Sequence, residues 1–283
     1  MEYQEFAGTG VKISAIGMGT YYGPSFIAAA LMFHHHSSRD RKIAALRKGI
    51  EIGINLIDTA EIYQTELIVA EAIKDYKRDE LFIATKVSPN HLRYDSVLRA
   101  AQKSLERLQC SYIDLYQIHW PNRIIPIGET MKAMEKLVED GKVRYLGLSN
   151  FSLDQMTDAE DALSKNKIAS NQVEYSLRDR GIEKGLLSYC EQNSIAIIAY
   201  RPLAHGALAT PDLKLGAVME EISKKHDGRT PAQIALNWLL NKGKTIFAIP
   251  RASRPERVIE DSGSTGWNLD MEEMSKLEEV VLG

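Results

Sequence analysis

Residues 81–118, LFIATKVSPNHLRYDSVLRAAQKSLERLQCSYIDLYQI, hold two strand-like runs with a helical pattern between them. The runs are Leu81 to Thr85 and Ile113 to Ile118. Between them, residues 96–108 place apolar side chains at helical spacing, at Val97, Ala101, Leu105 and Leu108. Most such runs in this chain are apolar throughout, which is typical of parallel strands that helices cover on both faces. The segment therefore predicts a strand, a helix and a second strand parallel to the first.

The same alternation extends over the whole chain. Further strands are predicted at Ala15 to Met18, Ile54 to Ile57, Tyr145 to Leu148, Ser170 to Glu174, Ile195 to Ala199 and Thr245 to Ile249. Further helices are predicted at Arg39 to Gly53, Thr130 to Glu139, Leu153 to Leu163, Glu183 to Gln192, Leu215 to Lys225 and Pro231 to Leu240. About eight strand and helix units in alternation favour a closed (β/α)8 TIM barrel.

No linker or charge block divides the chain, so residues 1–283 are predicted to form one barrel domain. The first residues, around Gly8-Thr9-Gly10, predict an N-terminal hairpin outside the barrel, and Asp270 to Leu282 predict a short C-terminal helix. The structural alternative is a doubly wound dinucleotide-binding fold. Its glycine fingerprint is missing, because Gly17-Met18-Gly19 is followed by Tyr22 where the third glycine belongs.

Composition limits the classes of partner. The 283 residues include 35 Lys and Arg against 38 Asp and Glu, and this balance argues against nucleic acid as the main partner. The longest apolar run, Phe26 to Phe33, is far shorter than the roughly 20 residues that cross a bilayer. Two cysteines and a start without a secretion signal predict a reduced, cytoplasmic protein.

Titratable residues follow three successive predicted strands. Asp58, Lys86 and His119 each come directly after a strand-like run, and the carboxyl ends of barrel strands carry active sites. Alone, each has an ordinary explanation: an Asp after a strand often caps a helix, and a single buried His is often only hydrogen-bonded. Together they predict a paired, pKa-shifted site. Tyr63, in the loop after Asp58, adds a phenol to the same rim, and Thr65 is predicted to cap the next helix.

These residues suggest proton transfer to a carbonyl oxygen as hydride reaches the carbonyl carbon. Tyr63 would be the acid, and a neighbouring ammonium, Lys86, would lower its pKa from about 10. Asp58 would hold Lys86, and a neutral His119 would orient the substrate carbonyl.

An anion site is predicted after the last strand, in IPRASRPER at 249–257. A helix that begins after Ser253 would direct its free N–H groups, a hydroxyl and guanidinium groups towards one anion, as in barrels that bind phosphate after their last strands. The alternative is a solvated helix start with ordinary surface arginines.

The chain resembles the aldo-keto reductases, NAD(P)H-dependent carbonyl reductases built on a (β/α)8 barrel. The resemblance runs from about Gly8 to Asp261, and its strongest segments are LIDTAEIY, IATK, SYIDLYQIHWP, GKVRYLGLSNF, NQVEYS and AIPRASRPERVIED. It implies that Asp58, Tyr63, Lys86 and His119 are the catalytic tetrad. It also implies NADP(H) as the cofactor and a small-molecule carbonyl compound as the substrate.

The resemblance implies cofactor contacts along the barrel rim. Ser149, Asn150 and Gln172 would hold the nicotinamide carboxamide, and Tyr200 would stack on the ring. Leu203, Ala204 and Gly206 would lie along the pyrophosphate, and Ser253, Arg257 and Arg251 would bind the 2′-phosphate. Glu260 and Asp261 would face the adenine, and the remaining implied cofactor contacts are Gly19, Thr20, Asp58 and Arg201. Taken alone, Ser149-Asn150 also fit a cap for the helix from Leu153, and Tyr200 also fits the core.

Three positions depart from the family pattern. Gln64 stands where glycine commonly follows the catalytic tyrosine, and it would alter a left-handed or crowded backbone position. Arg201 replaces the usual serine, and Asp261 replaces a common asparagine, which exchanges a donor and acceptor for an acceptor next to the adenine.

The segment 21–38 departs most. The implied substrate pocket comprises Tyr21, Tyr22, Tyr63, His119 and Trp120, and Phe26 and Phe33 would extend an apolar wall. His34, His35 and His36 are predicted to lie in a solvated loop and not to bind a metal, since adjacent histidines do not converge on one ion. The apolar stretch before them alternatively forms a short helix that packs on another subunit, so a homo-oligomer is compatible with the sequence.

The sequence thus predicts NADPH-dependent reduction of aldehydes or ketones to alcohols with Tyr63 as general acid. The alternative is a regulatory barrel that binds NADP(H) with little catalysis, which Gln64 keeps open. A metal hydrolase on the same fold would need ligands at the strand ends that the sequence does not contain.

Overall fold

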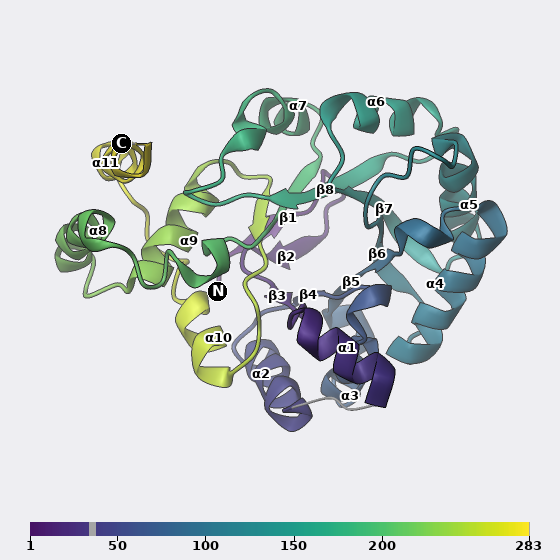
Figure 1. Ribbon diagram of the computed structural model, residues 1–283, viewed down its shortest axis with the longest axis horizontal. Helices are drawn as coiled ribbons and strands as arrows, with labels where there is room; N and C mark the ends of the chain where they lie inside the picture. The colour runs from purple at the N-terminus through teal and green to yellow at the C-terminus, as the bar shows by residue number, and fades with distance from the viewer. Residues whose placement is uncertain (34–37, 283) are drawn as a thin grey trace.

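The computed structural model describes residues 1–33 and 38–282, and its centre is a parallel β-barrel (Figure 1). Within these residues, eight parallel strands follow one another in chain order around the sheet. They are β3 (Met18–Gly19), β4 (Leu56–Asp58), β5 (Phe82–Val87), β6 (Ile113–Ile118), β7 (Val143–Ser149), β8 (Ile168–Glu174), β9 (Ala196–Tyr200) and β10 (Ile246–Ala248). Every residue of β4, β5 and β6 is buried, as the apolar runs predicted.

The first and last strands join and close the barrel. Parallel bridges link Ile16 to Ala248 and Gly19 to Arg251. The N–H of Gly19 donates to Pro250 O at 2.9 Å, and a Cβ at Gly19 would lie 2.9 Å from Ile249 O. Gly19 is therefore required by the close approach of two backbones at the seam, which explains this glycine without a dinucleotide fingerprint.

Helices form the outer layer, as predicted (Figure 1). One helix follows each strand in the ring, and α10 packs against α2 across the seam. These helices are α2 (Arg39–Glu51), α3 (Glu66–Ile73), α4 (Tyr94–Leu108), α5 (Ile127–Glu139), α6 (Leu153–Asp161), α7 (Leu186–Gln192), α9 (Pro231–Asn241) and α10 (Pro255–Ser262). The predicted (β/α)8 barrel is confirmed, and most predicted helix boundaries lie within three residues of the observed ones.

The N-terminal hairpin closes the amino-terminal end of the barrel. Its strands β1 (Tyr3–Glu5) and β2 (Lys12–Ser14) pair antiparallel. Phe6 at the turn is fully buried, with its ring centroid 4.8 Å from that of Phe82 and 6.0 Å from that of Phe247. Phe6 and Ile13 share one apolar cluster with the inward side chains of the strands. The hairpin thus fills the amino-terminal end of the barrel, and the rim at the carboxyl ends of the strands is left for the site.

Among the described residues, three α-helices lie outside the ring: α1 (Pro24–Phe33), α8 (Leu213–Lys225) and α11 (Met271–Leu282), of which α8 and α11 pack together (Figure 1). The predicted C-terminal helix is α11. Residues 24–33 form α1, the short helix predicted as an alternative for this apolar stretch, and Phe26 and Ala30 are buried in it. The predictions for His34 to His36 concern residues outside the described ones. In the described part of the chain, no helix is long and apolar enough to span a membrane.

Candidate active site

The carboxyl ends of the strands bring the predicted tetrad together. Asp58 is the last residue of β4, Lys86 lies near the end of β5, and His119 directly follows β6. Tyr63 ends the short 3-10 helix η1 (Glu61–Tyr63), which follows β4. All four side chains are buried or nearly so. The barrel topology therefore places residues up to 61 positions apart in the sequence in one cluster.

Lys86 and Asp58 form a buried ion pair. Lys86 Nζ donates to Asp58 Oδ1 at 2.6 Å, to Asp58 Oδ2 at 2.8 Å and to Thr59 O at 2.9 Å. Burial lowers the pKa of Lys86, and the Asp58 carboxylate opposes that shift. Three acceptors satisfy the three N–H groups of an ammonium, so this geometry fits a charged Lys86.

Tyr63 faces His119 and Lys86. Its hydroxyl lies 3.2 Å from His119 Nε2, and Lys86 Nζ lies 5.1 Å from the centre of the phenol ring. Burial, with the charge of Lys86, lowers the pKa of His119 to about 2. His119 is therefore neutral at physiological pH, as predicted for a group that orients a carbonyl.

The predicted direction of the Tyr63 pKa is wrong for this structure. Burial raises the pKa of Tyr63 well above that of a free tyrosine, and the charge of Asp58 raises it further. The charge of Arg201 opposes this shift only in part, and the Lys86 ammonium is hydrogen-bonded to Asp58 and Thr59. Tyr63 is thus a neutral phenol that retains its proton, as an acid must before it reacts.

Amide side chains line the neighbouring part of the rim. Gln172 Nε2 donates to Asp58 Oδ2 at 2.8 Å, and its oxygen makes no hydrogen bond with the described residues. Asn150 Nδ2 donates to Ser149 Oγ at 3.0 Å and to His119 O at 3.0 Å. The Tyr200 hydroxyl donates to Asn150 Oδ1 at 2.8 Å, which fixes the ring at the end of β9.

The alternative role of Ser149 and Asn150 is not observed, and that of Tyr200 is observed in part. The cap of α6 is Ser152, which forms a reciprocal capping box with Gln155, so Ser149 and Asn150 are left to the rim. Tyr200 is half-buried at the end of β9 and packs against the inner apolar cluster of the barrel.

The predicted anion segment follows β10. Arg254 precedes the first turn of α10, and Arg251 and Arg257 are exposed near it. Arg257 Nη1 lies 2.8 Å from Glu260 Oε2 in the same helix. These guanidinium groups, Ser253 and the free N–H groups of the first turn of α10 give the local positive charge that the sequence predicted.

Asp261 differs from the expectation of a plain acceptor. Burial raises the pKa of its carboxyl group to about 7, and Glu260 adds to this, although Arg257 opposes it. Near neutral pH, many of the protein molecules therefore carry a protonated carboxyl group at Asp261. That group offers one donor and one acceptor, as the asparagine commonly found there does.

The segment 201–206 holds its backbone in unusual conformations. Arg201, Ala204 and His205 have positive φ values of 50°, 47° and 57°, and Gly206 has 97°. Non-glycine residues adopt this region at an energetic cost, and such residues gather at functional sites. Leu203 N-caps the 3-10 helix η5 (Ala204–Gly206) within this turn, and Arg201 Nη1 bonds Glu174 Oε2 at 2.9 Å.

Two of the predicted pocket residues flank the tetrad. The Tyr21 ring lies 5.2 Å from that of Tyr63, and Trp120, 41% exposed, stacks on His119 at 3.8 Å. Tyr22 does not join them. Its hydroxyl donates to Ala252 O at 2.9 Å and its ring packs on Phe26, so it braces the segment after β10.

Sequence reasoning missed a cluster of threonines behind the tetrad. Thr65 precedes α3, yet its hydroxyl makes no capping bond. It lies instead 2.9 Å from Thr59 Oγ1 and 2.9 Å from Thr20 Oγ1. Thr20 has no exposed surface. Threonine is common in strands and caps, so the spacing carried no signal that these three hydroxyls meet.

Gln64 occupies a left-handed position, as its place after Tyr63 suggested. Its φ is 59°, and its Nε2 donates to Glu61 O at 3.2 Å. We expect Gln64→Gly to raise the free energy of unfolding by roughly 0.5–1 kcal/mol, because glycine adopts this conformation without strain. Urea denaturation would measure this. A loss of stability would show that the bond to Glu61 outweighs the strain.

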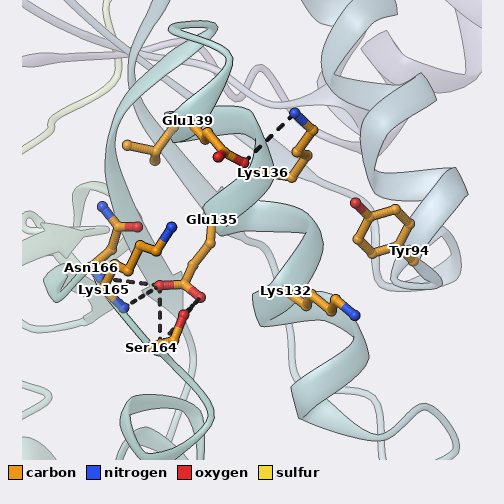
Figure 2. Close-up of a pocket in the computed structure, with 9 residues that line it drawn as sticks. Tyr94, Lys132, Glu135, Lys136, Glu139, Ser164, Lys165 and Asn166 are labelled. Atoms are coloured by element: carbon orange, nitrogen blue, oxygen red, sulfur yellow. Dashed lines mark hydrogen bonds and ion pairs between the residues drawn. The ribbon is translucent and has the colours of Figure 1, made fainter.

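A separate pocket lies on the outer layer, between α4, α5 and the loop before β8 (Figure 2). Its volume is about 430 Å³, and its lining includes Tyr94, Lys132 and Lys165. Glu135 accepts hydrogen bonds from the backbone N–H groups of residues 164–166, which anchors that loop. The tetrad does not line this pocket, so the two features are distinct.

Comparisons with known proteins agree with the fold. The aldo/keto reductase family model matches residues 16–282. Methylglyoxal reductase YeaE of Escherichia coli is 35% identical over 98% of this chain and 93% of its own length. Glyoxal reductase of Bacillus subtilis is 37% identical over 83% of this chain and 81% of its own length.

Solved structures are similar over nearly the whole chain. The thermostable aldo-keto reductase Tm1743, in complex with the inhibitor epalrestat, has a TM-score of 0.89 and 39% identity, and covers 99% of this chain and 100% of its own. An aldo/keto reductase from Klebsiella pneumoniae, in complex with NADP and acetate, has a TM-score of 0.84 and 36% identity, and covers 98% and 94%. The family model and the relatives lead to one conclusion: this chain belongs to the aldo/keto reductase family.

Proposed function

We propose that this protein is an NADP(H)-dependent reductase that converts small aldehydes or ketones to alcohols, with Tyr63 as the proton donor. The observation that carries the proposal is the position of the buried Tyr63 hydroxyl, which lies 3.2 Å from His119 Nε2. The relatives named methylglyoxal reductase and glyoxal reductase make dicarbonyl compounds the first substrates to test.

The rim residues fit the chemistry of a nicotinamide cofactor. A carboxamide requires a donor for its oxygen and acceptors for its NH2 group. Ser149 can donate its hydroxyl proton, since Ser149 Oγ accepts from Asn150, and Gln172 offers its unbonded oxygen. Arg251, Ser253 and Arg257 supply the positive charge and hydroxyl for a 2′-phosphate, which favours NADP(H) over NAD(H).

The proposed reaction assigns one role to each side chain of the tetrad. When bound beside them, a nicotinamide would supply the hydride for the carbonyl carbon. His119 Nε2 orients the carbonyl oxygen beside the Tyr63 hydroxyl, and Tyr63 gives its proton to that oxygen, which completes the alcohol. The remaining phenolate faces the Lys86 ammonium, 5.1 Å from the ring centre, and Asp58 holds that ammonium in place.

Absorbance at 340 nm tests the proposal directly. The protein should oxidise NADPH when methylglyoxal, glyoxal or a simple aldehyde is added. The rival regulatory barrel would bind NADPH and turn over none of them. Gln64 gives that rival little support, because its left-handed backbone leaves Tyr63 within reach of His119.

Arg257→Ala should weaken NADPH binding about tenfold and leave NADH binding within twofold. The guanidinium is half exposed and shared with Glu260, so we expect its bond to a 2′-phosphate to contribute about 1.4 kcal/mol, at the low end for charged pairs. Fluorescence titration measures both dissociation constants. Arg99→Ala, on the outer helix α4, is the control and should change neither constant. Equal losses for the two nucleotides would remove Arg257 from the 2′-phosphate site.

A further inference from the structure

We propose that Thr20, Thr59 and Thr65 are positioning residues that hold the Asp58–Thr59 segment against Lys86. This inference rests on the proposed reductase function for its kinetic test. The three hydroxyls come from the end of β3, the turn after β4 and the start of α3, and all three residues have no exposed surface.

The hydrogen bonds that link these three hydroxyls to one another and to the Asp58 carbonyl form a chain that can run in only one direction. The Thr20 hydroxyl donates to the backbone carbonyl of Asp58 at 3.0 Å. Each hydroxyl has one proton, so Thr20 Oγ1 must accept from Thr65, and Thr65 Oγ1 must accept from Thr59. The order is therefore Thr59 to Thr65 to Thr20 to the Asp58 carbonyl. A one-way chain polarises each of its members, and loss of one hydroxyl affects the others.

Both ends of the chain lie on the residues that hold Lys86. The three hydrogen bonds of Lys86 Nζ go to the two Asp58 carboxylate oxygens and to Thr59 O. The chain begins on the side chain of Thr59 and ends on the carbonyl of Asp58. It therefore adds side-chain bonds from Thr20 and Thr65 to two backbone bonds of that dipeptide, which run from Thr59 N–H to Ala84 O at 2.8 Å and from Thr20 N–H to Asp58 O at 3.0 Å.

Thr65 is itself held in place by the contacts of the next residue, Glu66. Glu66 is buried, and its carboxylate accepts from Thr85 Oγ1 at 2.7 Å and from Arg107 Nε at 2.6 Å. The start of α3 is thus tied to β5 and α4, so Thr65 is a fixed support for the chain. A shift of this support would move the Thr59 carbonyl, and the ammonium with it, relative to the ring of Tyr63.

Thr65→Val is the test, since valine keeps the shape of threonine and removes the central hydroxyl. We expect kcat per NADPH-binding site to fall about tenfold, because small misplacements in catalytic geometry are costly, while the NADPH dissociation constant stays within twofold. Thr65→Ser keeps the hydroxyl and should restore kcat to within twofold of the wild type. If Thr65→Val does not fold, Thr59→Val removes the first hydroxyl of the chain and should give the same loss of kcat with little change in NADPH binding.

Thr130→Val is the matched control. Thr130, on α5, is also buried, and its hydroxyl likewise donates to a backbone carbonyl, that of Leu92 before α4, at 2.7 Å. The Thr130→Val substitution should lower thermal stability and leave kcat per NADPH-binding site unchanged. A kcat for Thr65→Val within twofold of the wild type, or an equal loss in Thr130→Val, would overturn the positioning role.

Crystal structures of the wild type and Thr65→Val provide a readout that needs no activity. The distance from Lys86 Nζ to Thr59 O should remain near 2.9 Å in the wild type and exceed 3.5 Å in the variant. An unchanged distance would refute the positioning chain. If the wild type shows no turnover but the distance is longer in the variant, the reductase proposal is refuted and the positioning role of the three threonines is supported.

Discussion

Tyr63→Phe should lower kcat for NADPH-dependent aldehyde reduction by a factor of about 10² to 10⁴ and leave the NADPH dissociation constant within twofold. A positioned general acid contributes a factor of this size, and phenylalanine keeps the ring while it removes the proton. Burial and the charge of Asp58 raise the pKa of Tyr63, so the wild-type phenol is protonated at the pH of the assay. Stopped-flow absorbance at 340 nm measures the hydride step directly.

Tyr116→Phe is the control for this substitution. Tyr116 is fully buried on β6, its hydroxyl has no hydrogen-bond partner among the described residues, and it packs against the outer helices. Tyr116→Phe removes this buried hydroxyl and should leave kcat unchanged. A Tyr63→Phe enzyme that retains more than a third of the wild-type kcat would mean that another group, or water, supplies the proton.

The strand ends were predictable because a parallel barrel converts sequence order into spatial order. Asp58, Lys86 and His119 each follow a buried run, and the carboxyl ends of the strands meet at one rim. The resemblance added Ser149, Asn150 and Gln172, which the structure places on the same rim. The strand pattern thus predicted that Asp58, Lys86 and His119 share one rim, and the resemblance supplied the neighbouring polar residues.

The energetics of the site were less predictable. The sequence placed an ammonium next to a phenol, and pairwise reasoning predicted a lowered pKa for Tyr63. In the folded protein, Asp58 and Thr59 take all three Lys86 N–H groups, and burial then dominates at Tyr63. A sequence gives the neighbours of a residue and does not give the direction in which their hydrogen bonds point.

Segments outside the repeating pattern were the least predictable. Residues 24–33 have no helical alternation, so the sequence predicts a short helix there only as an alternative; in α1, Phe26 and Ala30 are buried, and Phe26 joins the main apolar cluster. Tyr22 was expected in the substrate pocket, but its hydroxyl binds Ala252 O instead. Such packing depends on tertiary contacts that no local pattern encodes.

Asp261→Asn should raise the free energy of unfolding at pH 8 by up to about 4 kcal/mol and change it little at pH 4. Burial, helped by Glu260, raises the pKa of the Asp261 carboxyl to about 7 in the folded state, whereas an unfolded aspartate titrates near 3.9. Between these two values the folded protein holds a proton that the unfolded chain has released. Wild-type stability from this group is therefore full below pH about 4, falls between pH about 4 and 7, and is lost above 7.

Asparagine removes that dependence because it has the same shape and does not ionise. Urea denaturation of both proteins at pH 4, 6 and 8 measures the difference. Asp158→Asn, on the exposed face of α6, is the control and should give one small difference at every pH. If the difference between wild type and Asp261→Asn were the same at pH 4 and pH 8, the carboxyl group would have the same pKa in the folded and unfolded states and would be ionised at neutral pH. The wild-type protein would then place a full negative charge beside the predicted adenine position, and its affinity for NADPH should lie below that of the asparagine variant.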